Sequence, residues 1–594
     1  MKIYRFILLL SAAFLLLPSC DEEMLDTKTN NDLSDEYIWG LPQKAEGVLM
    51  NAYNAIPMFV DHYNLNFLDV ATDNAVTNDY GSAVYELGHG ALSPRNQAPI
   101  GNWNQAYEQL NYINMFLKRG LRDDLKYNLD STVSEQYKTR LRGEAYFLRA
   151  WWLAELLRVY GGISNDGQAL GVPILTSPVP QDENITADLQ RDTYEACAKQ
   201  VFSDCDSAYK YLPIEYSEAS GPLSDQNIGR ANKKAALALK SRIATYAASP
   251  AYQPEDISQQ QVTQKWERAA RFSYEAIAEG QLGEYEKLEH SDMVGPDLSA
   301  TPDEYVFRIF YNNNGMENRN LPPAFYGDGQ TNPSQNLVNA FPSINGYPIG
   351  HPLADYDPQQ PYQQRDERLK RTIYCNGMNL EFDGRALQIY YDNETNAPGF
   401  DAPGYFRENT RTGYYLKKWI SRKPDMLEVD NIKSDFHMHP LIRRAEIYLN
   451  YAEASNQAAG PDGIVPQCDR SAVDIINEIR LKSGGITNTS YVSETANKGK
   501  KAFNELILNE RRLELAFENH RYFDLRRWKM DLNQTIYGTR IEKNAEGLVY
   551  QGTNPLGDQI PIEKREFNGS RYYYTPIPYG ELAKSPDMKN NKGW

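Results

Sequence analysis

A series of separate helical blocks with small or apolar inner faces constrains the fold more than any other feature of the chain. In residues 137–160, apolar side chains recur at spacings of three, four or seven residues, which is the period of one helix face. They are Leu141, Ala145, Leu148, Trp152 and Val159. Gly161 and Gly162 follow directly and favour an end to the helix. The pattern therefore predicts a long amphipathic helix that packs against neighbours.

Three further blocks repeat this pattern, at residues 230–249, 441–457 and 503–517. The first is rich in alanine and stops at Pro250, which suits helices that cross closely. Ala145 and Ala452 lie where such a crossing needs a small side chain. Weaker helical patterns occupy residues 103–117, 194–212, 266–279 and 471–481. We expect a mostly α fold, in which tetratricopeptide-like helical hairpins form one body without a strict repeat length.

Long insertions separate these blocks, at residues 254–265, 290–440 and 529–594. They are rich in Pro, Gly, Asn, Asp and Tyr, and they contain only short strand-like runs such as residues 304–311. Loops of this length are uncommon in compact proteins unless they carry function. We therefore expect loop-rich insertions with a few short strands, and we expect any binding site to lie in them.

The first twenty residues have the order of a secretory signal that ends at a cysteine. Lys2 and Arg5 precede an apolar run over residues 6–17, and small residues lead to Cys20. A run of this length makes about 18 Å of helix, which is too short for a hydrocarbon core about 30 Å thick. The sequence therefore predicts a signal peptide at residues 1–19, lipidation of Cys20, and a tether over residues 20–37.

The charge and the aromatic content limit the ligands. The formal net charge is -17 at pH 7, and loss of Lys2 and Arg5 with the signal peptide makes it -19. This charge argues against nucleic acid or anionic lipid as a ligand. The chain has 42 tyrosines and 8 tryptophans, a composition that suits either sugar binding or the filling of helical cores. Cys197 and Cys205 lie about 12 Å apart along one predicted helix, so we expect no disulfide framework.

Ordered motifs along the whole mature chain resemble the SusD/RagB family of surface glycan-binding lipoproteins. Residues 143–150 have the sequence GEAYFLRA, followed by YGG at 160–162 and GVPI at 171–174. The other motifs are ATDN at 71–74, WNQAY at 103–107, PSQNLV at 333–338, YQQRDERL at 362–369, RAEIYLNYAEA at 444–454, NERRLELAFE at 509–518, RYFDLRRW at 521–528 and PIP at 576–578. The early motif departs from the family's TDE-like pattern, since Asn74 stands in place of Glu.

The resemblance implies a non-catalytic protein whose partner is a SusC-like TonB-dependent outer-membrane transporter. It implies one α-helical body with four tetratricopeptide-like hairpins and with loops packed on one side. We divide the chain into an N-terminal SusD-like helical region at 38–250, a loop-rich insertion region at 251–440, and a C-terminal RagB/SusD helical region and tail at 441–594. Acidic residues 21–23 are similar to a surface-export signal, so we expect a lipid anchor on the outer face of the outer membrane.

Two groups of residues could be mistaken for an active site or a metal site. Glu510, Glu514 and Glu518 lie on one helix face, and a glycosidase needs two carboxylates about 5–10 Å apart. The surrounding arginines at 511, 512, 521, 526 and 527 favour a charge-paired helix instead. His437 and His439 could bind zinc, but no third ligand is evident, and we expect a capped loop before Pro440. We expect no metal or cofactor.

The tyrosine run at 572–574 predicts a buried strand or an edge strand and not a stacking platform.

Candidate glycan-binding residues follow from the resemblance. In the family, such residues come from the loop after the TDE-like motif and from the central insertion. On this chain they are Asn78, Asp79, Tyr80 and Tyr85 in the first loop, and Tyr311, Asn313 and Tyr326 in the second. Tyr80 and Tyr326 are the favoured stacking platforms. The alternatives are that these tyrosines pack the loops onto the body, or that the site lies in the loop from Tyr390 and Tyr391 to Tyr405.

The favoured hypothesis is therefore a lipoprotein that captures an oligosaccharide or polysaccharide and passes it to the transporter for nutrient uptake. A secreted glycoside hydrolase with its carboxylates in the long loops is the second hypothesis. A tetratricopeptide-type scaffold that binds peptides is the third. The sequence does not specify which glycan is bound.

Overall fold

The computed structural model describes most of the chain. The described residues are 35–57, 66–179, 190–297, 301–313, 315–379, 385–422, 427–428, 431–433 and 435–594. Cys20 and the predicted signal peptide lie outside them. Within the described residues, no helix is both long enough and apolar enough to cross a membrane.

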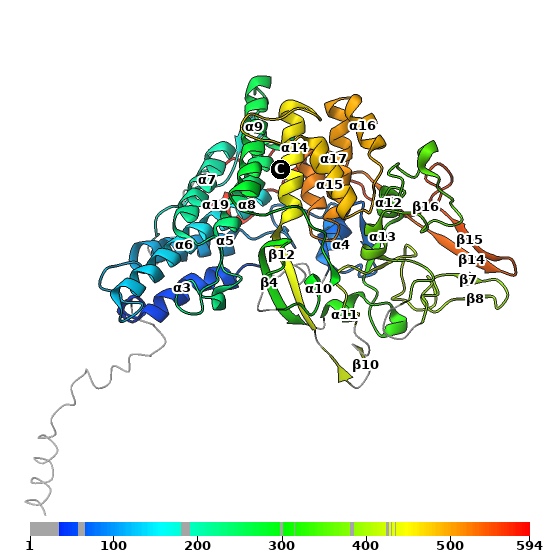
Figure 1. The fold of residues 1–594 in the computed structure, drawn as a ribbon, viewed down its shortest axis with the longest axis horizontal. Coiled ribbons are helices and arrows are strands. Elements are labelled where there is room, and N and C mark those ends of the chain that lie inside the picture. Colours follow the sequence, from blue (N-terminus) through cyan, green and yellow to red (C-terminus); the bar gives the residue numbers. More distant parts are fainter. Residues whose placement is uncertain are drawn as a thin grey trace, which may run out of the picture.

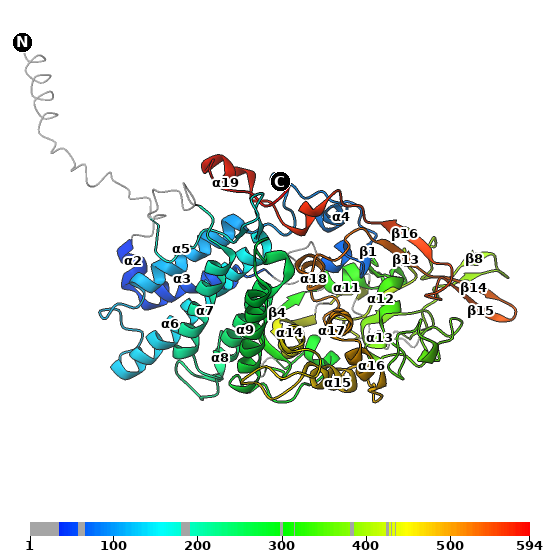
Figure 2. The same cartoon turned by 90° about the horizontal axis from the view of Figure 1, so that it is seen from above.

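The long helices form an elongated body in which each helix packs against the next along the chain (Figure 1). The series runs through α3 (Pro42–Asn54), α5 (Trp103–Arg119), α6 (Ser131–Tyr160), α7 (Tyr194–Tyr211), α8 (Lys233–Ala248), α9 (Gln259–Ala278) and α14 (Arg444–Ala459). The helices α15 (Ala472–Lys482), α16 (Ser490–Asn497) and α17 (Lys500–Glu514) complete it on the far side of α14. Seen from above, these helices stand side by side (Figure 2). The predicted mostly α fold is confirmed.

Local sequence explains where these helices begin and how closely they pack. Asp130 caps α6, since its Oδ1 accepts hydrogen bonds from the backbone N–H groups of Thr132 and Val133. A Cβ on Gly143 would lie 2.7 Å from Cγ of Leu212, so only glycine lets α6 approach the end of α7 this closely. Ala145 and Ala452 are fully buried, as a close helix crossing requires.

Several predicted boundaries are wrong. A capping box at Ser258 and Gln261 starts α9 at Gln259, inside the predicted loop 254–265. The helix predicted from residue 441 starts at Arg444 instead, because residues 435–443 form a strand. The helix α2 (Asp35–Gly40) overlaps the end of the predicted tether.

The strands form small sheets beside the helical body. Strand β4 (Tyr305–Asn313) pairs antiparallel with β12 (Asp435–Arg443), so His437 and His439 lie in a strand and the predicted loop is wrong. The four-stranded sheet at the far end of the body contains β8 (Ala397–Pro398), β7 (Tyr391–Asp392), β14 (Arg540–Asn544) and β15 (Gly547–Gln551).

Further pairs are β1 (Ala75–Thr77) with β5 (Thr331–Pro333), β2 (Gly162–Ile163) with β3 (Ala169–Leu170), β6 (Ile373–Tyr374) with β9 (Tyr415–Leu416), β10 (Leu427–Glu428) with β11 (Asn431–Ile432), and β13 (Thr535–Gly538) with β16 (Ile560–Lys564). The predicted strand at the tyrosine run is wrong, because residues Ser570–Tyr573 form a short 3-10 helix.

A buried ion pair joins the N-terminal and C-terminal regions of the chain. Arg521 binds Asp73 in bidentate fashion at 2.8 and 2.9 Å, and Arg512 lies 3.1 Å from the same carboxylate. Burial opposes ionisation of Asp73, but the two guanidinium groups outweigh it and hold its pKa well below the usual value. The early ATDN motif therefore has a structural role. The four cysteines among the described residues are free, in agreement with the absence of a disulfide framework.

Candidate functional site

Loops from three distant parts of the chain meet on one surface, and Asn78 joins them. Its Nδ2 donates hydrogen bonds to the carbonyl oxygens of Asp328 and Glu408, both at 2.7 Å. These residues follow Asn78 by 250 and 330 positions. Because an amide nitrogen has two hydrogens to donate, both are occupied within the protein. This arrangement favours a structural role for Asn78 beneath the surface.

Asp79 fixes the turn that carries Tyr80. Its Oδ1 accepts a hydrogen bond from the N–H of Gly81 at 3.3 Å, and its Oδ2 accepts one from Nε2 of Gln330 at 3.3 Å. The first contact is an Asx turn, and the second ties the turn to the neighbouring loop. Asp79 is half-buried, and its carboxylate mainly stabilises the loop.

Tyr80 presents an exposed ring whose back is supported by a fixed cation. Its side chain is 55% exposed, and the guanidinium carbon of Arg411 lies 4.8 Å from the ring centroid. Nη1 of Arg411 is held by Oε2 of Glu563 at 2.7 Å and by the carbonyl oxygen of Thr77 at 2.8 Å. The ring of Tyr80 is therefore positioned by a network and does not swing freely.

Tyr85 supports Tyr80 from the side. The two ring centroids are 5.3 Å apart and the rings are nearly perpendicular, in an edge-to-face contact. The ring of His89 lies 4.2 Å from that of Tyr85, and its Nε2 is 3.6 Å from Oε1 of Glu563. Burial raises the pKa of Tyr85, and the nearby Glu563 adds to this effect. Tyr85 is half-buried and acts mainly as a support for Tyr80.

Tyr326 is a second exposed ring on the same cluster of loops. Its side chain is 65% exposed, and its backbone adopts a left-handed conformation at φ 65°. Two residues later, Asp328 accepts from Asn78 and its Oδ2 pairs with Nη1 of Arg319 at 2.9 Å. The structure thus brings the two favoured residues, Tyr80 and Tyr326, into loops that contact each other directly.

Tyr311 and Asn313 belong to a different part of the molecule. Both lie in β4, where Tyr311 is paired with His437 and Asn313 with Asp435 of β12. This two-stranded ribbon lies apart from α4 (Ala83–Gly88), which follows Tyr80 (Figure 1). The central insertion therefore divides between the ribbon and the loop cluster.

Three exposed aromatic rings lie close in sequence to Glu408, and of these only Tyr405 was named from the sequence. Phe400, Tyr405 and Phe406 are each about two-fifths exposed. The rings of Phe400 and Tyr405 stack at 4.5 Å, and Phe406 makes an edge contact with Tyr405 at 4.7 Å. Nδ2 of Asn409 fixes the loop by donating to the carbonyl oxygen of Phe400 at 2.9 Å. We call Phe400, Tyr405 and Phe406 the aromatic triad.

The sequence contains a signal for the triad, although only Tyr405 was predicted from it. Three aromatic residues fall within seven positions between two polar segments, and Gly399 and Gly404 allow tight turns there. Arg411 had no comparable signal, because its position over Tyr80 depends on Glu563 and Thr77 from other loops.

The carboxylates considered as glycosidase candidates are paired in the interior. Glu510 binds Arg480 and Arg368, each at 2.6 Å. Burial raises the pKa of Glu510, but Arg368 and Arg480 outweigh it and lower the pKa overall. Glu514 and Glu518 both pair with Arg443, at 3.0 and 2.8 Å. The charge-paired interpretation is confirmed, although these arginines come from other segments than the neighbouring ones predicted.

The histidine pair is also engaged in the interior. Nε2 of His437 lies 2.9 Å from Oε1 of Glu317, and both side chains are fully buried. The ring of His439 packs against Trp419 at 4.4 Å, and burial lowers its pKa well below the usual value. Among the described residues, no group of three or more His, Cys, Asp or Glu side chains is arranged to hold a metal ion.

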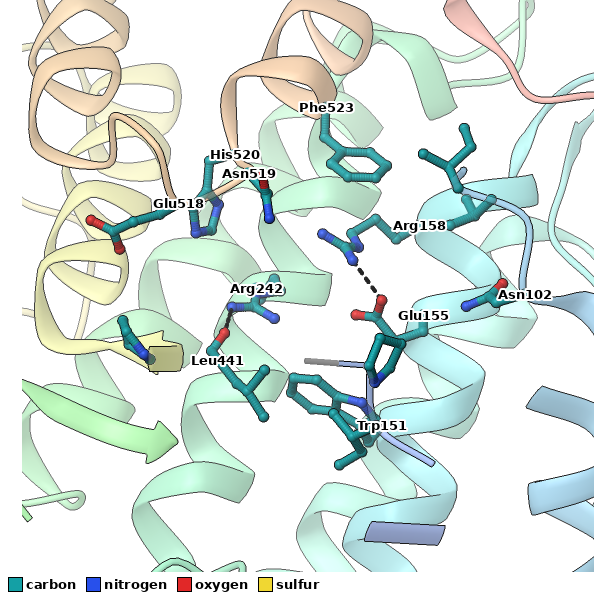
Figure 3. A pocket seen from close by; sticks show the side chains of 15 residues that line it. Asn102, Trp151, Glu155, Arg158, Arg242, Leu441, Glu518, Asn519, His520 and Phe523 are labelled. Atoms are coloured by element: carbon teal, nitrogen blue, oxygen red, sulfur yellow. Dashed lines mark hydrogen bonds and ion pairs between the residues drawn. The ribbon is translucent and has the colours of Figure 1, made fainter. Parts of the chain in front are cut away.

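A small cavity lies between α6, α8 and α18 (Arg521–Arg527), and Figure 3 shows its lining. Its volume is about 90 Å³, the share of only a few waters. Glu155 pairs with Arg158 at 2.5 Å, and Arg242 pairs with Glu446 at 2.6 Å. The cavity combines paired charges with small size, so it does not suit a sugar ring.

Comparison with known proteins agrees with the architecture. The SusD family model matches residues 297–594, which is half of the chain. The chain belongs to the SusD family. A second model, described as starch-binding and associating with the outer membrane, matches residues 23–245.

Relatives of this SusD-family protein match along most of its length. SusD-like protein P38 of Formosa agariphila is 24% identical over 538 residues, which are 88% of this chain and 90% of that protein. SusD-like protein P25 of the same organism is 23% identical over 553 residues, which are 90% of this chain and 87% of that protein.

Solved structures share the fold. A SusD-like protein from Bacteroides fragilis has a TM-score of 0.68 at 23% identity and covers 95% of this chain and 99% of its own. A SusD-like carbohydrate binding protein from the same species has a TM-score of 0.68 at 20% identity, with 93% and 99% covered.

Proposed function

We propose that this SusD-family protein is a non-catalytic lipoprotein that binds an oligosaccharide or polysaccharide at the cell surface and delivers it to a TonB-dependent outer-membrane transporter. The glycan lies across the loop cluster, with Tyr80 and Tyr326 as platforms and the aromatic triad beside them. Family membership and the description of the second family model, starch-binding and associating with the outer membrane, support this proposal.

The observation that carries the proposal is the set of exposed rings on loops that are fixed by side-chain hydrogen bonds to backbone carbonyl groups. The C–H face of a sugar packs against a flat ring, and its hydroxyls need polar partners in the plane of the sugar. The exposed residues Arg407 and Glu408 beside the triad provide such groups, while Arg411 supports the ring of Tyr80 from behind. Because Asn78 and Asn409 hold the loops, little conformational entropy is lost on binding.

Calorimetry with a glycan identified on an array tests the site. Loss of two ring contacts at about 1 kcal/mol each predicts that the Tyr80→Ala, Tyr326→Ala double variant binds at least about tenfold more weakly. Tyr579→Ala is a matched control, since Tyr579 is also exposed and carries Arg95 over its ring at 3.8 Å, but lies in α19 (Tyr579–Lys584). Undiminished affinity in a folded double variant would move the site to the triad, where Tyr405→Ala is the next test.

The same glycan distinguishes binding from hydrolysis. We expect the protein to migrate more slowly in a gel that contains the polysaccharide. We also expect the polysaccharide to keep its chain length after prolonged incubation with the protein. The pairing of Glu510, Glu514 and Glu518 with basic side chains supports this expectation. Shortening of the glycan by pure protein would favour the hydrolase hypothesis.

Anchoring and the partner require cellular experiments. Incorporation of a clickable fatty acid into the wild type, and its loss in Cys20→Ala, tests the lipid anchor. Protease treatment of intact cells tests surface exposure, since a surface protein is degraded while periplasmic proteins survive. Co-purification of the lipidated chain with a TonB-dependent transporter tests the partner, and isolation of the chain alone from gently solubilised membranes would argue against it.

A further inference from the structure

Exposed apolar side chains gather at the end of the body where the described chain begins. Tyr37 lies in α2, Leu41 lies between α2 and α3, and Leu129 lies in the turn before α6; all three are exposed, and Leu129 fully so. The segment between α5 and α6 that leads to this turn contacts α2, since Nη2 of Arg122 donates to the carbonyl oxygen of Trp39 at 3.4 Å. Figures 1 and 2 place α2 and α3 at one end of the body, opposite the four-stranded sheet.

The turn holds Leu129 outward in a fixed geometry. The N–H of Asp130 donates to Oδ1 of Asn128 at 2.9 Å, and Asp130 in turn caps α6. On the other side, the hydroxyl of Tyr127 donates to the carbonyl oxygen of Gly120 at 2.9 Å. A large apolar side chain that is fully exposed on an ordered turn contributes no buried area to the stability of the monomer. Its position therefore raises the question of what it contacts in the cell.

Cationic side chains lie near these apolar residues. Lys44 lies 5.5 Å from the ring of Tyr37, Arg119 lies 5.9 Å from the ring of the buried Trp39, and Lys126 is exposed three residues before Leu129. Asp123, Asp124 and Asp130 balance them, so the area carries little net charge. Apolar and aromatic side chains with long cations around them suit a membrane interface, where the chain stems lie in the apolar layer and the charges reach the headgroups.

We propose that this end of the protein rests on the outer leaflet of the membrane, with Leu129, Leu41 and Tyr37 inserted among the lipid headgroups. The inference rests on the lipid anchor at Cys20 proposed above. Fourteen residues lie between Cys20 and Asp35, so an extended tether spans at most about 50 Å and begins at this end of the body. The anchor keeps the local lipid concentration high, and weak apolar insertion then suffices. The overall negative charge is tolerated because the contact is apolar.

A fluorescent reporter on the lipidated full-length protein tests the contact. In a Cys468→Ser background, single cysteines are introduced as Leu129→Cys or Leu556→Cys and labelled with an environment-sensitive dye; the other described cysteines are buried. Leu556 is the matched control, since it is exposed in the loop between β15 and β16, at the opposite end. In vesicles of phosphatidylcholine and phosphatidylethanolamine, we expect a blue shift at position 129 and none at position 556.

A second set of variants separates insertion from mere proximity. With the dye on Lys126→Cys, the double change Leu41→Asp, Leu129→Asp should abolish the blue shift, and Leu556→Asp should preserve it. Vesicle flotation reports the anchor independently. Protein that floats without a shift at position 129 overturns the inference and leaves the anchor intact, whereas protein that does not float overturns both. A shift that requires an added membrane protein also overturns the inference and assigns this end to a protein partner.

Discussion

Glu304 makes the free energy of unfolding of this protein fall as the pH rises. The side chain is buried, its Oε1 accepts the N–H of Ala445 at 2.7 Å, and Arg443 is 3.4 Å away. Arg443 already pairs more closely with Glu514 and Glu518. Burial therefore dominates and raises the pKa of Glu304 from 4.5 to about 8, despite Arg443. At neutral pH Glu304 is protonated in the folded state and ionised in the unfolded state.

The sign and the size of the effect follow from this difference. Between pH 4.5 and about 8 the folded state holds one more proton at Glu304, so its contribution to stability falls by about 1.4 kcal/mol per pH unit. Glutamine mimics the protonated acid and does not ionise in the unfolded state. Glu304→Gln should therefore match the wild type near pH 4.5 and exceed its free energy of unfolding by about 3 kcal/mol at pH 7.

Urea unfolding followed by tryptophan fluorescence, at several pH values across this range, measures the effect. Glu284→Gln is the control, because Glu284 is exposed and pairs with Lys482 at the surface, so its stability difference from wild type should not change with pH in this way. If Glu304→Gln is less stable than wild type at pH 7, the prediction is wrong. Glu304 is then ionised in the folded wild type and is stabilised by its ion pair with Arg443.

Three other predictions concern the packing, the loop cluster and the anchor. Ala145→Leu or Ala452→Leu should overpack a helix crossing and lower the free energy of unfolding by about 1–3 kcal/mol. A variant with the same melting temperature as wild type would contradict the packed hairpins. Asn78→Ala should remove the donor shared by the carbonyl groups of Asp328 and Glu408, cost about 0.5–1.5 kcal/mol for each hydrogen bond and weaken glycan binding without touching the ligand. Unchanged affinity by calorimetry would show that the loops keep their positions without it. Cys20→Ala should yield unlipidated precursor or soluble protein, and a variant that still incorporates the fatty acid would place the anchor elsewhere.

The carboxylates at 510, 514 and 518 illustrate what a sequence pattern can decide. The number of arginines nearby correctly indicated paired charges, because a buried carboxylate without a partner is costly. The partners themselves could not be predicted, since Glu510 binds Arg368 across 142 positions while the adjacent Arg511 turns to Asp524. A helix face specifies which side chains point inward, but the neighbouring segments specify what they meet.

The sequence by itself determined the helices, since their period, their caps and their small residues act within a few turns and predict the same structure at each level. It also indicated the family membership and, for the described residues, the free cysteines. Only the tertiary structure decided that His437 lies in a strand, because β4 supplies the pairing from more than a hundred positions away. The surface of Tyr80, Tyr326 and the aromatic triad likewise arises from contacts such as Asn78 with Glu408, which join segments 330 positions apart. Loops carry no periodic pattern, so their positions depend on such long-range hydrogen bonds rather than on local sequence.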